Sequence, residues 1–215
     1  MQKCMHIASN IRDWKYTHEN YRYTMHHKSL LLIQHNLREY CIGSQVPCIS
    51  QATQEYLAVF LTKHKPMRCL EIGSACGYSL LTTALLVEPR GGTVCGCERA
   101  YPNRVILSHN TALVRQYGLT NYNCVFGQFL QLPITSRGNE PYDFIFVDAQ
   151  KAEYPLYITH LVENKLIHEN TKIIFDDVIK YQDRMTDLTQ TLEQYGFKHE
   201  LKQLENDDGI LIVYQ

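Results

Sequence analysis

The sequence predicts an α/β fold built on a doubly wound, mostly parallel sheet of seven strands. Short runs of β-branched and aromatic residues alternate along the chain with longer segments whose apolar residues follow helical spacing. The last two apolar runs lie too close together for a crossover helix, which indicates an antiparallel hairpin at the sheet edge. The first 45 residues contain no clear strand, so we expect an N-terminal helical extension.

The expected elements follow one another in a regular order. Two helices precede the first strand, at residues 29–40 and 51–63. Five strands follow, at residues 67–72, 93–98, 123–127, 142–147 and 172–175. Three helices lie between these strands, at residues 78–87, 102–117 and 153–166. Pro102 suits a first helical turn, and Gly118 follows the last turn, where a left-handed cap is favourable. The strands of the hairpin complete the sheet, at residues 197–204 and 209–214.

Composition and charge fit a single domain that spans residues 1–215, with the extension at residues 1–45 and the sheet-bearing core at residues 46–215. Lys and Arg number 21 against 22 Asp and Glu, which gives a net charge of 21 − 22 = −1. This balance excludes a protein that binds nucleic acid mainly through a globally basic face, but it allows a local basic patch. The apolar runs are too short to span a membrane, and the first residues do not resemble a signal peptide. We therefore expect a cytoplasmic protein whose 8 cysteines are reduced.

The N-terminal segment is more basic than the chain as a whole. Its first 40 residues carry six Lys or Arg against three Asp or Glu, and Trp14, Tyr16, Tyr21 and Tyr23 lie among them. Two interpretations stay open. The segment is either a helical lid or dimer-packing extension, or an arm that holds RNA through phosphate contacts and base stacking.

Carboxylates gather where the expected strands end. Ligands of such sheets bind in the crevice beyond the carboxyl ends of the strands, so the residues that follow each strand are the candidate site. Four of the five parallel strands end next to an acidic residue. The segments at these ends are, in order, Glu71 to Ser79, Glu98, Gly127-Gln128, Asp148 to Lys151, and Asp176-Asp177.

The glycine turn at residues 71–79 indicates which ligand this crevice takes. Its pattern is Glu-x-Gly-x-x-x-Gly, and Ala75 and Tyr78 stand where a dinucleotide-binding fingerprint needs its second and third glycines. No G-x-x-x-x-G-K-[ST] phosphate loop occurs, and Glu71 would repel a phosphate. Glu98, at the end of the next strand, can accept hydrogen bonds from both hydroxyls of a ribose. A ligand with a ribose, a positive centre and no phosphate fits best, and S-adenosylmethionine is such a ligand.

Three motifs, in order, carry a resemblance to a known family. They are Leu70-Glu-Ile-Gly-Ser-Ala-Cys-Gly-Tyr-Ser79, Tyr142-Asp-Phe-Ile-Phe-Val-Asp148 with Lys151, and Ile173-Ile-Phe-Asp-Asp177. With these motifs the chain resembles the class I S-adenosylmethionine-dependent O-methyltransferases of the catechol and caffeoyl-CoA type, a family that includes bacterial tRNA 5-hydroxyuridine methyltransferases. The resemblance runs from about Val46 to Val213 and implies a Rossmann-like fold.

The resemblance also implies a role for each matching residue. Glu98 would bind the ribose and Gly127-Gln128 would lie beside the adenine, in a cofactor site made of Val46, Glu71, Gly73, Ser79, Glu98, Gly127, Gln128 and Asp148. A divalent cation, usually Mg²⁺, would be bound by Asp148, Asp176 and Asp177, and Lys151 would take the proton of the substrate hydroxyl. Carboxylates suit a hard cation, which lowers the pKa of a bound hydroxyl and is expected to lower the pKa of Lys151 as well.

Two departures from the family pattern bear on the chemistry. Asp177 stands where the family commonly has Asn, so it either adds a third carboxylate to the cation site or points away and caps the next segment. Residues 178–184 lack the bulky aromatic wall that a catechol site would have. We expect a cation-dependent O-methyltransferase that acts on a small, catechol-like hydroxylated acceptor, and we expect a homodimer. A tRNA wobble hydroxyuridine methyltransferase and an inactive cofactor-binding interaction module are the alternatives.

Overall fold

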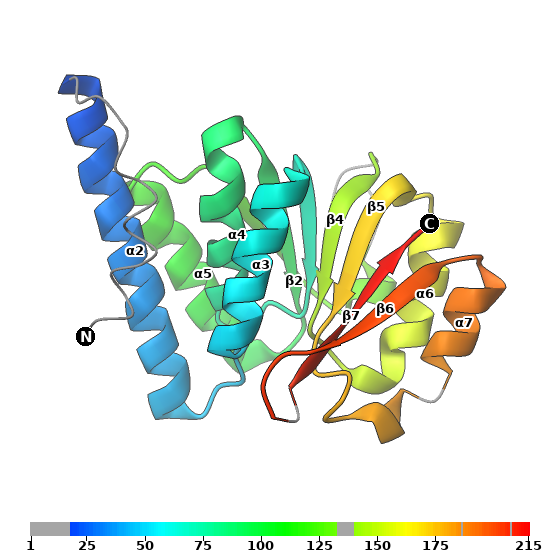
Figure 1. Ribbon diagram of the computed structural model, residues 1–215. Helices are drawn as coiled ribbons and strands as arrows, with labels where there is room; N and C mark the ends of the chain where they lie inside the picture. Colours follow the sequence, from blue (N-terminus) through cyan, green and yellow to red (C-terminus); the bar gives the residue numbers. More distant parts are fainter. Residues whose placement is uncertain (1–17, 133–139, 186, 207) are drawn as a thin grey trace.

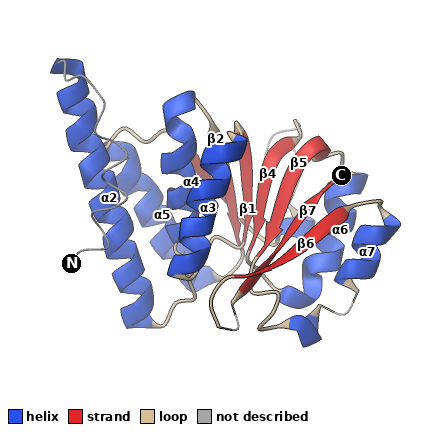
Figure 2. Cartoon of the chain, in the orientation of Figure 1, coloured by secondary structure: helices blue, strands red, loops and turns tan. Residues whose placement is uncertain are grey.

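One sheet of seven strands forms the centre of the molecule (Figure 2). The computed structural model describes residues 18–132, 140–185, 187–206 and 208–215, with side chains from residue 27 onward. Within these ranges the strands run in the order β3-β2-β1-β4-β5-β7-β6. They are β1 (Arg68–Ile72), β2 (Thr93–Glu98), β3 (Tyr122–Phe126), β4 (Tyr142–Val147), β5 (Ile167–Phe175), β6 (Lys198–Gln203) and β7 (Gly209–Tyr214).

The pairing of the strands confirms the predicted fold class. The strands β1 to β5 pair in parallel, whereas β7 is antiparallel to both β5 and β6. Ile72, the last residue of β1, lies opposite Cys97 of β2 and Val147 of β4. The residues that follow these three strands therefore meet at the carboxyl ends of the strands, where the sequence predicts the ligand crevice.

Helices cover both faces of the sheet. The helices α3 (Gln51–His64), α4 (Tyr78–Val87) and α5 (Tyr101–Gln116) pack on one face, and α6 (Tyr154–Glu163) and α7 (Leu188–Gln194) pack on the other. The long helix α2 (His18–Ser44) lies beyond α4, at the end of the molecule where β3 forms the sheet edge (Figure 1). The side chain of Gln34 in α2 donates a 2.6 Å hydrogen bond to Thr82 Oγ1 in α4. The described part of the N-terminal extension is thus helical, as predicted, whereas Lys3, Arg12 and Lys15 of its basic segment lie outside the described residues.

Strand β4 shows how the sequence fills both faces. Phe144 and Phe146 point into the core beneath α3 and α4, and Ile145 and Val147 point into the core beneath α6. All four side chains are buried. A strand segment without a solvent-facing side is typical of a parallel sheet covered by helices, and it explains why residues 144–147 are all apolar.

Local signals set several helix ends. The Ser50 hydroxyl caps α3 by accepting a 2.9 Å hydrogen bond from the Thr53 N–H, and the left-handed Lys65 ends the same helix. Pro102 lies in the first turn of α5, and Gly118, with a φ of 85°, follows its last turn. Both signals around α5 were read correctly from the sequence.

The structure differs from the sequence prediction on the β5 side of the sheet. Strand β5 begins at Ile167, five residues before the expected start, and α6 ends at Glu163 rather than at residue 166. The early part of β5 contains His168, Glu169 and Asn170, whose polarity is typical of a loop. Helix α7 was not expected, because it buries only Leu188 and Leu192, too few apolar residues to show a helical period.

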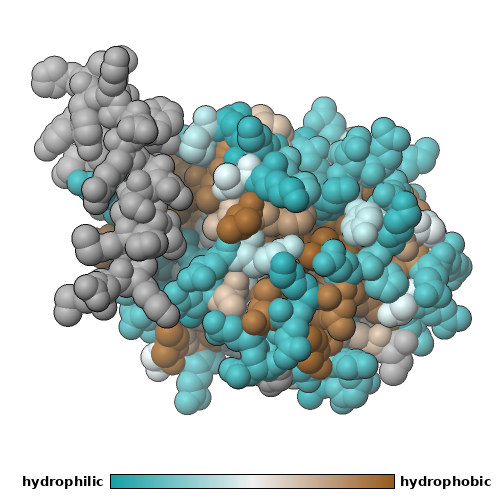
Figure 3. All heavy atoms as spheres, viewed as in Figure 1, coloured by the Kyte–Doolittle hydropathy of each residue, from teal (hydrophilic) through white to brown (hydrophobic). Residues whose placement is uncertain are grey.

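Figure 3 shows the distribution of hydrophilic and apolar residues on one face of the molecule. Hydrophilic residues cover most of this face, and apolar residues appear between them in the middle of the view. None of the helices in the described ranges combines the length and apolar character that a membrane span requires.

Candidate active site

A cavity of about 410 Å³ lies at the carboxyl ends of the parallel strands. Residues that follow β1, β2, β3 and β4 line its wall, which confirms the predicted position of the crevice. Among the candidate site residues, Gly73, Glu98, Gly127, Gln128, Asp148, Lys151 and Asp177 line this cavity. The wall also contains Pro47, Phe129, Tyr157, Tyr181 and Arg184, none of which the sequence singled out.

Gly73 brings the chain after β1 close to the chain after β4. Its φ is 91°, and a Cβ atom at this position would clash with the carbonyl oxygen of Asp148. Only glycine combines this backbone conformation with this close approach. The Gly73 N–H donates a 3.0 Å hydrogen bond to the Cys97 carbonyl, which holds the turn against the end of β2.

Glu98 is buried at the end of β2, and backbone amides fix its carboxylate. Oε2 accepts a 2.7 Å hydrogen bond from the Ala75 N–H, and Oε1 accepts a 2.6 Å bond from the Ala100 N–H. Each oxygen keeps a further lone pair, and the side chain lines the cavity. The arrangement matches an acceptor for two vicinal hydroxyls.

Three aspartates meet at the other end of the cavity, where Asp148 and Asp177 line the wall and Asp176 is buried beside them, outside the set of lining residues. Carboxylate oxygens of Asp148, Asp176 and Asp177 lie within 4.8 Å of one another. Asp176 is only 3% exposed. Burial, together with the charges of Asp148 and Asp177, raises the pKa of Asp176 well above its usual range. Three carboxylates this close repel one another, so the cluster favours a cation, and hard oxygen donors of this kind suit Mg²⁺ or another hard divalent ion.

Asp177 points into the cluster and not away from it. Its Oδ2 lies 3.4 Å from Lys151 Nζ, and its φ of 59° places it in the left-handed region, which Asp tolerates better than most residues. This backbone turn directs consecutive carboxylates, those of Asp176 and Asp177, to the same site. The alternative that Asp177 faces away and caps the next segment is therefore wrong.

Lys151 lies among these carboxylates, in the turn before α6. Its Nζ is 2.8 Å from Asp148 Oδ1 and 2.9 Å from Tyr154 Oη. Burial alone would lower the pKa of Lys151, but the neighbouring Asp148 carboxylate and the Tyr154 hydroxyl raise it above its usual value. With the protein groups alone, the side chain is thus an ammonium ion. Its action as a base requires another positive charge at the cluster, which is the role expected of the cation.

Tyr154 is a supporting residue that sequence reasoning missed. Its ring is fully buried against Phe175, with ring centres 4.9 Å apart, and its hydroxyl lies 3.1 Å from the Asp176 carbonyl. It therefore links Lys151 to the segment that carries Asp176 and Asp177. The spacing Lys151-x-x-Tyr154, which aligns two side chains on one helical face, was the available signal.

Three predicted cofactor residues lie behind the cavity wall. Glu71 is buried, and its Oε1 accepts a 3.0 Å hydrogen bond from Ser79 Oγ, while Oε2 has no hydrogen-bond partner among the residues that the structure describes. Burial raises the pKa of Glu71 to about 8. Val46 packs against the core beside Pro47, which does line the cavity. The cofactor roles of Val46, Glu71 and Ser79 stay predictions.

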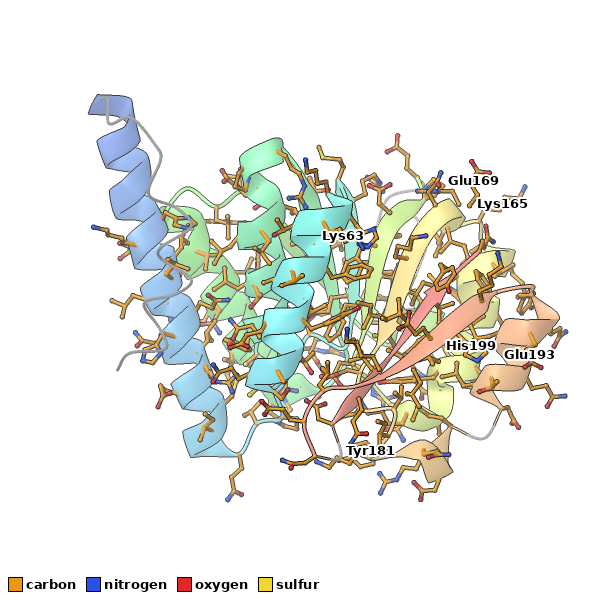
Figure 4. All side chains as sticks on the ribbon, viewed as in Figure 1. Lys63, Lys165, Glu169, Tyr181, Glu193 and His199 are labelled. Carbon is orange, nitrogen blue, oxygen red and sulfur yellow. The ribbon has the colours of Figure 1, made fainter. Side chains whose placement is uncertain are left out.

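An aromatic side chain is present where none was expected. Tyr181, in the segment after Asp177, lines the cavity, with its ring centre 5.8 Å from Lys151 Nζ. Figure 4 shows Tyr181 at the carboxyl-end edge of the sheet, far from Lys165 and Glu169 at the opposite edge. The expectation that residues 178–184 lack an aromatic wall is corrected accordingly. A single tyrosine gave no periodic signal, and its position depends on the short helical turn that follows it.

A buried hydroxyl network supports the acidic cluster from α3. Thr53 Oγ1 lies 3.3 Å from Asp176 Oδ1 and 3.4 Å from Asp208 Oδ2. The Ser50 hydroxyl also donates to Asp208, which lies between β6 and β7. The start of α3 and the hairpin loop thus meet beside Asp176.

Comparisons with known proteins give a consistent result. The family model described as O-methyltransferase matches residues 30–214. An O-methyltransferase, ankF, of Aspergillus thermomutatus is 36% identical over 127 residues, which are 59% of this chain and 52% of that protein. A caffeoyl-CoA O-methyltransferase of Stellaria longipes is 28% identical over 130 residues, 58% of this chain and 52% of that protein. The chain spans about half the length of these curated relatives.

Solved structures share the fold. An O-methyltransferase from Bacillus cereus in complex with SAH has a TM-score of 0.66 and 21% identity, over 97% of this chain and 94% of that one. A putative caffeoyl-CoA O-methyltransferase from Staphylococcus aureus has a TM-score of 0.67 and 21% identity, over 89% of this chain and 100% of that one. These names give no support to the tRNA alternative. The family match covers most of the sequence, including every strand and the whole candidate site, and the chain therefore belongs to the O-methyltransferase family.

Proposed function

We propose that the protein transfers a methyl group from S-adenosylmethionine to a hydroxyl of a small, catechol-like acceptor, with a divalent cation such as Mg²⁺ bound by Asp148, Asp176 and Asp177. The observation that carries the proposal is the cluster of three carboxylates beside Lys151, at the wall of the cavity that also contains Glu98. Family membership supports the reaction class. The S-adenosylmethionine or SAH in solved relatives of the same fold supports the cofactor.

The cofactor end of the cavity is built to bind a ribose and a positively charged centre. Glu98 offers two fixed oxygens to the ribose hydroxyls, and Gly127 and Gln128 extend the wall beyond it. Gly73 lines the same wall, where the amino-acid end of the cofactor would lie. Asp148, at the junction of the two ends, would place negative charge near the sulfonium of a bound cofactor and so stabilise it.

The acidic end holds and orients the acceptor. A divalent cation bound there would act as a Lewis acid that lowers the pKa of an acceptor hydroxyl. The three aspartates supply the donors, and Tyr181 supplies an apolar ring beside them, which suits an aromatic acceptor. Lys151 lies within the cluster, where its amine can receive the hydroxyl proton once the cation has reduced the negative charge around it.

Geometry is the chain's main contribution to the rate. Methyl transfer needs the acceptor oxygen in line with the sulfonium carbon, and fixing two reactants in this way is worth about 7–11 kcal/mol. Strands β1, β2 and β4 carry the cofactor residues, and β4 and β5 carry the aspartates, so rigid parallel pairing sets the distance between the two halves of the site.

Labelled methyl transfer tests the proposal. We expect transfer to acceptors with two adjacent hydroxyls, loss of transfer in EDTA, and recovery when Mg²⁺ is restored. A panel of matched monohydroxy phenols should react more slowly, because they offer the cation one oxygen. Transfer that EDTA leaves unchanged would contradict the cation site, and equal transfer to both panels would contradict the catechol-like acceptor.

Cofactor binding separates this proposal from an inactive module. Saturating S-adenosylmethionine at a hundredfold excess over Kd should raise the free energy of unfolding by about 2.7 kcal/mol. Absence of a thermal shift would contradict cofactor binding itself. A clear shift without transfer to any acceptor would favour the interaction module.

A further inference from the structure

Three cysteines from distant parts of the sequence meet next to the glycine turn. Cys41 lies near the end of α2, Cys48 in the loop before α3, and Cys76 in the turn after β1. The Sγ atoms of Cys41 and Cys76 are 2.8 Å apart, about 0.8 Å longer than an S–S bond of about 2.0 Å. The seven cysteines among the described residues are all free thiols.

The three thiols differ in access and charge. Cys41 and Cys76 are fully buried, whereas Cys48 is partly exposed. The thiol of Cys41 interacts with Cys48 as well as with Cys76. This interaction, aided by the positive charge of Arg38, lowers the pKa of Cys48 to about 7. The lowered pKa favours the thiolate of Cys48, which is the form that oxidants attack.

We propose that Cys41, Cys48 and Cys76 form a peroxide-oxidised site, in which a disulfide between Cys41 and Cys76 joins α2 to the glycine turn. Cys48 is the entry point, because it combines exposure with thiolate character. Cys41 is the relay, because its sulfur lies 2.8 Å from that of Cys76 and its thiol also interacts with that of Cys48. This site is independent of the proposed methyl transfer, since neither its formation nor its test requires activity.

The chemistry balances with hydrogen peroxide as the oxidant. The Cys48 thiolate attacks one peroxide oxygen, the O–O bond breaks, and with one proton the products are a sulfenic acid and water. The Cys41 thiol then displaces the sulfenic hydroxyl as a second water and forms a Cys41–Cys48 disulfide. The Cys76 thiolate attacks the Cys41 sulfur, and Cys48 leaves as a thiolate, which its lowered pKa favours. In total, two thiols and one peroxide give one disulfide and two waters.

The cross-link would tie α2 to the turn after β1, next to the residue that binds Glu98. Cys76 follows Ala75, whose N–H is bonded to Glu98, and the Cys76 carbonyl accepts a 2.9 Å hydrogen bond from Asn110 Nδ2. Because the sulfurs already touch, closing the bond requires little movement of the turn. The disulfide joins residues 35 positions apart and so restricts the unfolded chain. We expect it to raise the melting temperature and to leave the affinity for S-adenosylmethionine nearly unchanged.

The test uses the full chain, reduced and then treated with stoichiometric hydrogen peroxide. We expect non-reducing peptide mapping to find the Cys41–Cys76 cross-link, and the melting temperature to rise and to return on adding dithiothreitol. Cys76→Ser should abolish both changes. Cys48→Ser should slow cross-link formation about tenfold or more, because it removes the reactive thiolate. Cys124→Ser, a substitution of a half-buried thiol on β3, should behave as wild type.

Two results would overturn the inference. One is oxidation of Cys48 without a Cys41–Cys76 cross-link in the mapped peptides. The other is an equal rise in melting temperature in the Cys76→Ser variant. If Cys76→Ser does not fold, the reversal by dithiothreitol in the wild type, together with the mapped cross-link and the Cys48→Ser rate, decides the question.

Discussion

The two ends of the cavity achieve their geometry in different ways. At the cofactor end, both oxygens of Glu98 are hydrogen-bonded by backbone amides at 2.7 and 2.6 Å. At the acidic end, Asp176 is equally buried, but among the described residues its carboxylate has only the hydroxyl of Thr53, at 3.3 Å, and it faces two further carboxylates. The cofactor end is preorganised by the fold, whereas the positive charge paired with the acidic end within the described residues is that of Lys151, and the proposed cation would supply the rest.

Because of this difference, we expect substitutions at the two ends to have different effects on cofactor binding and on cation dependence. A substitution at the cofactor end should weaken cofactor binding and leave the dependence on the cation intact. Replacement of Asp176 at the acidic end should do the reverse, and it should not lower stability, because it removes repulsion by the neighbouring carboxylates of Asp148 and Asp177. The predictions below test this separation.

Asp176→Asn should have the largest effect. It removes one carboxylate of the proposed cation site, so we expect kcat/KM for methyl transfer to fall about a thousandfold or more, since Lewis-acid stabilisation is worth several kcal/mol and each 1.4 kcal/mol is tenfold. The affinity for S-adenosylmethionine, measured calorimetrically, should stay within about threefold, and the free energy of unfolding should not fall.

Asp183→Asn is the matched control, because Asp183 is exposed and lies outside the cavity wall. It should leave transfer unchanged. Equal activity of Asp176→Asn and the wild type over a range of Mg²⁺ concentrations would show that the acidic cluster has no catalytic role.

Lys151→Ala should reduce kcat about 10²- to 10⁴-fold, the usual contribution of a general base. The loss should appear in kcat at saturating acceptor, with little change in cofactor affinity. Lys63→Ala, at an exposed position on α3 remote from the site, is the control (Figure 4). Near-normal turnover of Lys151→Ala would contradict the assignment of Lys151 as the base.

Glu98→Gln tests the cofactor end. A glutamine cannot accept from both the Ala75 and Ala100 amides with its carbonyl oxygen, because its NH₂ group would face one of these donors. We expect the Kd for S-adenosylmethionine to rise about 10- to 100-fold, as for the loss of a hydrogen bond to a charged group. The Mg²⁺ concentration for half-maximal activity should not change. A variant that binds the cofactor as tightly as wild type would contradict the assignment.

The same two ends show what the sequence can and cannot predict. The order of strands and helices and the position of the crevice followed from periodicity and from the rule for parallel sheets, and the pairing of Ile72 with Cys97 and Val147 confirms the convergence. The contacts of Tyr181 and Tyr154, and the packing of Cys41 against Cys76, depend on how distant segments meet, which no local pattern encodes. The homodimer, the cytoplasmic location and the single-domain boundaries stay predictions.

Glu71, in β1 just before the glycine turn, should make the free energy of unfolding depend on pH. Burial raises its pKa to about 8 in the folded protein, against 4.5 for an ordinary glutamate. Between these values the folded state holds a proton that the unfolded state has lost, so the free energy of unfolding should fall as pH rises, by up to about 1.4 kcal/mol per pH unit. Glu71→Gln should reduce this slope in urea titrations of the cofactor-free protein between pH 5 and 8. Glu193→Gln, at an exposed position, should keep the wild-type slope, and an unchanged slope in Glu71→Gln would show that Glu71 ionises normally.

Thr53→Val should have the smallest effect. It tests whether the hydroxyl that contacts Asp176 helps to orient the acidic end. The substitution removes a fully buried hydroxyl that is 3.3 Å from Asp176 Oδ1 while keeping the shape of the side chain. Loss of a partner that orients a metal ligand commonly lowers metal affinity 10- to 100-fold. Because the hydrogen bond from Thr53 is long, we expect its loss to lower the affinity for Mg²⁺ only about three- to tenfold. We expect the Mg²⁺ concentration for half-maximal activity to rise and kcat at saturating Mg²⁺ to stay unchanged. Thr83→Val removes a buried hydroxyl on α4 that has no hydrogen-bond partner in the described part of the chain, so it should not change the Mg²⁺ concentration for half-maximal activity. Equal Mg²⁺ requirements in both variants would mean that the backbone alone orients Asp176, and the acidic end would then be as preorganised as the cofactor end.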